Sequence, residues 1–88
     1  MDEDLETLKE EYRRLLKRYE SIKPLHQKRL VGAINTIEYA FGSVERNINQ
    51  LSDKCLLDRI RERCIENILE YLSLAEKNIV YGEKKLKV

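Results

Sequence analysis

The sequence contains very little proline, glycine, cysteine or histidine, and each shortage excludes a class of protein. Its 88 residues include one Pro, three Gly, two Cys, one His and no Trp. Scarce Pro and Gly exclude collagen-like and low-complexity chains, and two Cys are too few for a disulfide-stapled scaffold. No apolar run approaches the roughly 20 residues that span a bilayer. We therefore expect no membrane association.

Charged side chains are abundant instead, at 38% of the chain with a formal net charge of +1. A chain of 88 residues is long enough to bury one modest core, so we predict a single domain over 1–88. Placed on one helix, Cys55 and Cys64 would point to opposite sides about 13 Å apart along the axis and could not pair. Unpaired thiols are typical of buried positions in a reducing compartment, which predicts a cytoplasmic protein.

Two runs of apolar residues recur at heptad spacing. The first comprises Leu5, Leu8, Tyr12, Leu15, Tyr19 and Ile22, and the second Leu30, Ile34, Ile37, Phe41, Val44, Ile48 and Leu51. This spacing places each run on one side of an α-helix that must pack against another helix. Helices one and two are therefore predicted over 4–22 and 24–51, with Pro24 ending the first and opening the second.

A third helix is predicted over 54–84, after a turn at Ser52 and Asp53. Its core face is expected to hold Leu57, Ile60, Cys64, Ile68, Tyr71, Ala75 and Ile79. The residues from Gly82 onward are expected to fray. The fold class is then an all-α, antiparallel (up-down-up) three-helix bundle with coiled-coil-like packing. One continuous helix from Pro24 onward is the alternative, although the apolar stripe loses register between Leu51 and Leu57.

No group of residues resembles a catalytic, metal or cofactor site. The single histidine, His26, stands beside Lys28 and Arg29 without a carboxylate to tune it as a base. A metal site needs clustered ligands, and glycine-rich phosphate loops are absent. Of the five tyrosines, Tyr39 and Tyr81 fall off the core stripes. We predict a protein that is not an enzyme and that binds no metal or cofactor.

An apolar surplus on the third helix favours a protein-interaction function. Four residues lie to one side of its predicted core face: Ile65, Leu69, Leu72 and Val80. A helix in a small bundle needs an apolar arc of only about 100°. The surplus predicts a surface that binds a protein partner or a second copy of the chain as a homodimer.

Clustered cations favour a different function, the binding of nucleic acid without sequence preference. Residues 12–29 hold seven basic side chains and one acidic side chain, and residues 76–88 hold four basic and two acidic side chains. An up-down-up bundle would bring these segments together at one end, the basic pole, formed by Arg13, Arg14, Lys17, Arg18, Lys23, Lys28, Arg29, Lys84, Lys85 and Lys87. Cations also belong at helix C-termini for structural reasons alone, so nucleic acid ranks second.

Overall fold

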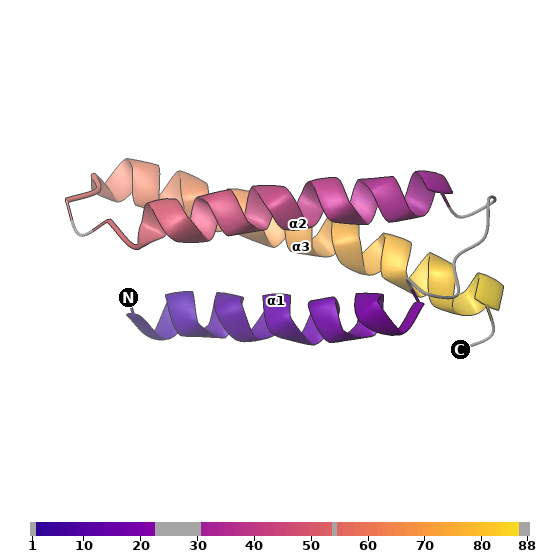
Figure 1. The fold of residues 1–88 in the computed structure, drawn as a ribbon. Coiled ribbons are helices and arrows are strands. Elements are labelled where there is room, and N and C mark those ends of the chain that lie inside the picture. Colours follow the sequence, from indigo (N-terminus) through magenta and orange to yellow (C-terminus); the bar gives the residue numbers. More distant parts are fainter. Residues whose placement is uncertain (1, 23–30, 54, 87–88) are drawn as a thin grey trace.

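Three helices make up most of the described chain. The computed structural model describes residues 2–22, 31–53 and 55–86, and its helices are α1 (Asp2–Ile22), α2 (Val31–Leu51) and α3 (Asp58–Leu86). Figure 1 shows α1 and α3 running in one direction and α2 running back. The predicted all-α, up-down-up three-helix bundle is confirmed. The predicted turn at Pro24, with His26, lies outside the described residues.

The heptad stripes of the sequence form the core. Ile37, Ile68 and Ile79 are completely excluded from solvent, because helical periodicity keeps their side chains directed at the neighbouring helices. The other buried side chains of the core come from all three helices: Leu8, Leu15, Tyr19, Ile22, Ile34, Ala40, Phe41, Val44, Leu51, Cys64, Leu72 and Ala75. The two stripes predicted for the first two helices therefore face inward wherever the structure describes them.

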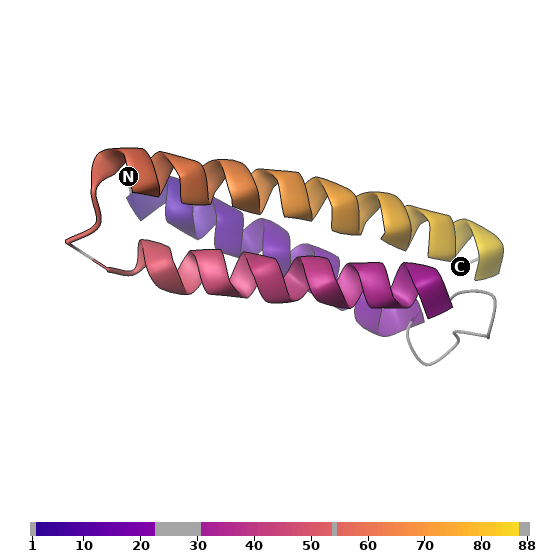
Figure 2. The ribbon, with the colours of Figure 1, turned by 90° about the horizontal axis from the view of Figure 1, so that it is seen from above.

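The helix α3 packs against both other helices, and α1 and α2 contact each other less. The α1–α2 contact includes Phe41, whose ring meets Tyr12 and Tyr19 edge-to-face at centroid distances of 5.2 and 5.6 Å. In Figure 1, α2 and α3 form a pair with α1 on one side of it. Figure 2 views the pair from the opposite side, which no described helix covers. We call this uncovered side the outer face.

The turn between α2 and α3 differs from the prediction. The second helix ends at Leu51 as expected, but α3 begins at Asp58 rather than at residue 54. The Asp53 carboxylate accepts a hydrogen bond from the Cys55 amide at 2.9 Å, which closes an Asx-turn instead of capping a helix. The first bond into α3 runs from the Arg61 amide to the Leu57 carbonyl. The alternative of one continuous helix is therefore also wrong.

This later start changes the surroundings of two residues. Leu57 was expected in the core but is 59% exposed, because it precedes the helix and helical periodicity does not direct its side chain. Cys55 lies in the turn and is exposed, whereas Cys64 is buried in the core. The expectation of two buried thiols therefore holds for Cys64 alone.

The C-terminal part of α3 is packed rather than frayed. The helix continues to Leu86, and Gly82 is buried. A Cβ atom at Gly82 would lie 2.9 Å from Cδ1 of Ile22, which is closer than van der Waals contact allows. Glycine thus lets the end of α1 approach the backbone of α3. The prediction that the chain frays from Gly82 onward is therefore wrong for residues 82–86, which remain helical.

Two glycine substitutions should have different effects on stability. A Cβ at Gly42 would meet only the Arg46 side chain, at 3.6 Å. Gly42→Ala should therefore raise the free energy of unfolding by about 0.5–1 kcal/mol through helix propensity. Gly82→Ala should be less stable than Gly42→Ala by about 1 kcal/mol, because the added methyl displaces Ile22. Urea denaturation measures both.

Ile22→Val supplies the control because it removes the Cδ1 atom that the new methyl would meet. In that background Gly82→Ala should become neutral or stabilising, which a double-mutant cycle would detect as a coupling between the two sites. Equal stability of the Gly42→Ala and Gly82→Ala proteins would contradict the close approach.

Candidate interaction surfaces

The predicted basic pole is partly neutralised by ion pairs between α1 and α3. The Arg18 guanidinium donates two hydrogen bonds to the Glu83 carboxylate, at 2.7 Å from Nη2 and 3.2 Å from Nε. Arg14 Nη2 lies 2.8 Å from Glu11 and 3.0 Å from Glu76. These bonds hold α1 against α3 and leave the two arginines less available to a phosphate.

The same bonds shift the titration of the groups involved. The hydrogen bond from Arg18 lowers the pKa of the Glu83 carboxyl, against a smaller opposing effect of burial. The bond from Arg14 likewise lowers the pKa of Glu11. Both glutamates therefore remain charged under conditions in which free carboxylates begin to take up protons.

The remaining cations of the pole do not form one described patch. Arg13, Lys17, Lys84 and Lys85 are exposed, and Lys85 lies 5.6 Å from the centre of the Tyr81 ring. Lys23, Lys28, Arg29 and Lys87 lie outside the described residues. Within the described part of the chain, the geometry therefore offers scattered single charges rather than a continuous phosphate-binding surface.

The four α3 residues predicted as a partner surface lie on or beside the side that faces α1. The ion-paired Glu76 and Glu83 mark this side. At about 100° of rotation around the helix axis per residue, each of the four side chains points within about 50° of the direction of Glu76 and Glu83. Leu72 is buried in the core, Ile65 and Val80 are half-buried, and Leu69 is 54% exposed.

The apolar surplus of α3 therefore has a structural cause. A helix that packs against two neighbours needs a wider apolar arc than one that packs against a single neighbour, and Leu72 and Ile65 supply the extra width toward α1. Leu72 cannot contact a partner while the bundle is folded, so its assignment to the partner surface is wrong. Of the four residues, only Leu69 is largely exposed.

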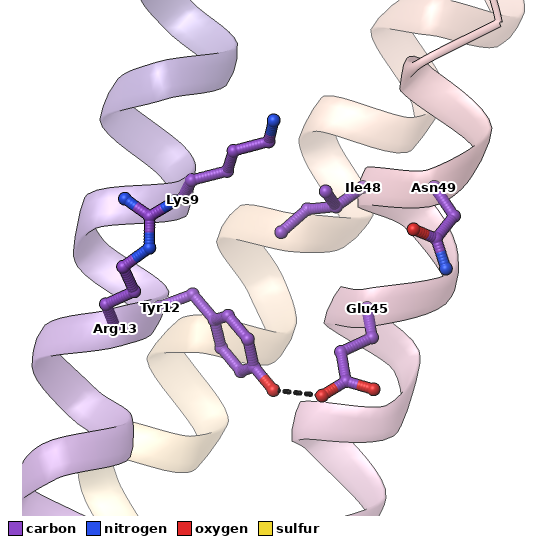
Figure 3. Close-up of a pocket in the computed structure, with 6 residues that line it drawn as sticks. All are labelled: Lys9, Tyr12, Arg13, Glu45, Ile48 and Asn49. Carbon is purple, nitrogen blue, oxygen red and sulfur yellow. Dashed lines mark hydrogen bonds between the residues drawn. The ribbon is translucent and has the colours of Figure 1, made fainter.

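A cleft of about 300 Å³ lies between α1 and α2 (Figure 3). It is lined by Lys9, Tyr12, Arg13, Glu45, Ile48 and Asn49. The Tyr12 hydroxyl donates a hydrogen bond to Glu45 across the cleft. Burial and this bond raise the pKa of the Tyr12 phenol, which therefore stays a hydrogen-bond donor and ties α1 to α2.

Tyr19 makes the second such tie, donating to the Glu38 carboxylate at 2.8 Å. Each of the two tyrosines therefore joins α1 to a carboxylate of α2. Over the described residues, no three His, Cys, Asp or Glu side chains are grouped so that they could hold a metal ion.

The outer face carries a group of aromatic and apolar side chains that the sequence analysis did not select as a site. Tyr39 is 60% exposed, and its ring packs edge-to-face on Tyr71 of α3 at 5.9 Å. It points away from α1 because it is two residues, or about 200°, from Phe41, which contacts α1. A hydrogen bond with Tyr39 raises the pKa of the Tyr71 phenol.

Further residues of α3 continue this group along the outer face. Leu74 and Tyr81 each lie two positions from the ion-paired Glu76 and Glu83, and so point away from α1. Leu74 is half-buried and Tyr81 is 46% exposed. We call Tyr39, Tyr71, Leu74 and Tyr81 the tyrosine group.

A signal for this group is present in the sequence. Ile60, Asn67, Leu74 and Tyr81 are each seven residues apart, which is the heptad spacing of a second packing line on α3. The α2 helix occupies part of this line, since Asn67 donates a hydrogen bond to Asn47 at 3.4 Å. A single centred core face on α3 includes Tyr71 and leaves this second line unrecognised.

Comparison with known protein families, curated proteins and solved structures finds no match for this chain. In the described part of the chain, none of the helices combines the length and apolar character needed to cross a membrane.

Removing the carboxylate at Glu83 should weaken the bundle in a pH-dependent way. Because the pKa of Glu83 is lowered in the folded protein, its contribution is present above the unfolded pKa of about 4.3 and is lost as the pH falls through the folded pKa. Glu83→Gln should cost about 0.5–1 kcal/mol of unfolding free energy at pH 7 and close to nothing at pH 2.

Urea denaturation of both proteins at the two pH values tests this expectation. Glu62→Gln is the matched control, since Glu62 is an exposed residue of the same helix and makes no ion pair within 4.0 Å among the described residues. A cost at pH 2 equal to that at pH 7 would show that the loss comes from packing and not from charge.

Proposed function

We propose that the protein is a small non-enzymatic interaction module, and that it docks an amphipathic helix of another protein on its outer face. The tyrosine group is the observation that carries the proposal. Tyrosine is enriched at protein interfaces because it combines a large apolar ring with a polar end. Here two half-exposed rings, Tyr39 and Tyr81, belong to the side of the α2–α3 pair opposite α1, which no described helix covers (Figure 2).

A helix is the occupant that fits this side best. The second packing line of α3 has heptad spacing from Ile60 to Tyr81, the pattern into which the side chains of another helix interlock. A docked helix would lie along the α2–α3 pair opposite α1 and would convert three helices into four. Helix three thus remains the principal binding element, as expected from the sequence, but through a different side.

The exposed tyrosine rings would supply part of the binding energy of this contact. An aromatic side chain buries roughly 150–250 Å², and about half of each exposed ring remains to be covered. At about 25 cal/mol per Å², Tyr39 and Tyr81 would together contribute on the order of 5 kcal/mol before the costs of association. The unpaired thiols Cys55 and Cys64 are compatible with the cytoplasmic location that we propose for this module.

Titration with a designed helical peptide tests the docking site. The probe has leucine at heptad a and d positions and equal numbers of Glu and Lys elsewhere, so that its net charge is zero. Amide chemical-shift changes should concentrate at Tyr39, Tyr71, Leu74 and Tyr81. The Tyr39→Ser/Tyr81→Ser protein should bind the peptide about tenfold more weakly, as measured by fluorescence anisotropy.

Leu69→Ser is the matched control, because Leu69 is equally exposed but lies beside α1. It should leave the affinity unchanged. A loss of affinity in Leu69→Ser with none in the tyrosine variant would return the binding surface to the α1 side of α3. Absence of binding to the wild-type protein at millimolar peptide would remove the docking function.

A further inference from the structure

We infer that the helix docked on the outer face is acidic along its flanks, an inference that rests on the docking function proposed above. The reason is the charge around the tyrosine group. Five exposed cations lie near this group or near Ile60, at the other end of the second packing line: Arg46, Arg59, Arg63, Lys77 and Lys85. Glu70 is the acidic residue next to this group, since it adjoins Tyr71. We call the five cations the basic rim.

Contacts connect most of the rim to the outer face. The Arg46 guanidinium donates to the Ser43 hydroxyl at 3.0 Å, and Ser43 also hydrogen-bonds with Tyr71. Arg59 and Arg63 flank Ile60 in a shallow hollow at the start of α3. Lys85 lies over the Tyr81 ring, 5.6 Å from its centre. The rim thus runs along the whole length of the second packing line.

The rim residues have no acidic partner, in contrast to the two arginines that join α1 to α3. Arg14 and Arg18 are satisfied by Glu76 and Glu83 across the α1–α3 interface. Among the residues that the structure describes, no carboxylate lies within 4.0 Å of a charged nitrogen of Arg46, Arg59, Arg63, Lys77 or Lys85. Glu66 and Glu70 of α3 are exposed near the rim, but five cations against two carboxylates leave the charge near the tyrosine group positive.

This arrangement selects among the possible occupants of the face. A second copy packed by two-fold symmetry would bring the basic rim against itself, because both subunits contribute the same surface, and like charges at an interface oppose association. An amphipathic helix with Glu or Asp beside its apolar stripe pairs with the rim while its leucines cover the tyrosine group. Such flanking pairs set the choice of partner in helix–helix recognition.

Three peptides with identical heptad leucines distinguish the alternatives. Their remaining charged positions are all Glu, all Lys, or balanced, and each is titrated into the full chain at low and at high salt. The Glu peptide should bind about tenfold more tightly than the balanced one at low salt and lose this advantage at high salt. The Lys peptide should bind more weakly than both.

A pair of charge reversals locates the effect. Arg59→Glu/Arg63→Glu should abolish or invert the preference for the Glu peptide. It should fold normally because both side chains are exposed and because an acidic residue at position 59, in the first turn of α3, is favourable. Arg13→Glu/Lys17→Glu is the matched control, with the same spacing and charge change on α1. It should retain the preference.

Every other outcome overturns the inference in a recognisable way. Equal binding of the three peptides, or tightest binding of the balanced or Lys peptide, leaves the docking site standing and refutes its acidic partner. If both double variants lose the preference for the Glu peptide, that preference arises from the overall charge of the protein and not from the basic rim. Duplex DNA bound more tightly than the Glu peptide, and released by Arg59→Glu/Arg63→Glu, makes the rim a nucleic-acid surface. Failure of all peptides to bind refutes the docking function itself.

Discussion

The position of α3 between its two neighbours is the constraint on which the other features depend. A helix with one neighbour can direct a narrow apolar stripe inward and leave the rest of its circumference polar. Because α3 packs against both α1 and α2, it must be apolar over a wider arc, and Leu72 and Ile65 belong to that arc. The extra apolar residues of α3, from which the sequence predicts a partner surface, thus contribute to the contact with α1. The surface that we propose for a partner lies on the other side, where α2 and α3 meet away from α1.

Charge is divided between the two sides of the bundle in a related manner. On the α1 side, Arg14 and Arg18 form ion pairs with Glu76 and Glu83, so these two arginines of α1 serve the intramolecular contact. On the outer face, the basic rim has no described acidic partner. Arg14 and Arg18 are neutralised by ion pairs, whereas the basic rim is exposed. The two sides of the bundle therefore differ in charge although the net charge of the chain is only +1. Net charge and charge clusters along the sequence do not reveal this difference, because it depends on which helices face each other.

The sequence predicts the helices well because helical periodicity is a property of each segment alone. The ends of α1 and α2 at Ile22 and Leu51 follow from the end of each apolar stripe. The start of α3 was placed four residues too early because Asp53 can either cap a helix or close an Asx-turn, and the local sequence permits both. The contact of Gly82 with Ile22 joins residues sixty positions apart, which no local pattern encodes. For the same reason the tyrosine group could be recognised only after the side covered by α1 was known.

The limited contact of α1 with α2 also sets how the molecule opens. The α2–α3 hairpin has the most extensive interface, whereas α1 is attached mainly to one of its members. The cheapest partial unfolding is therefore release of α1 from an intact hairpin, an opening that costs less than global unfolding. Backbone amides of α1 should then exchange with deuterium sooner than those at the centres of α2 and α3, and high salt should widen the gap by screening the arginine–glutamate pairs. Uniform exchange across the three helices would instead indicate one cooperative unit. A detached α1 would bare Leu72 and Ile65, so the most hydrophobic surface this protein can present belongs to a transient state and not to the folded bundle.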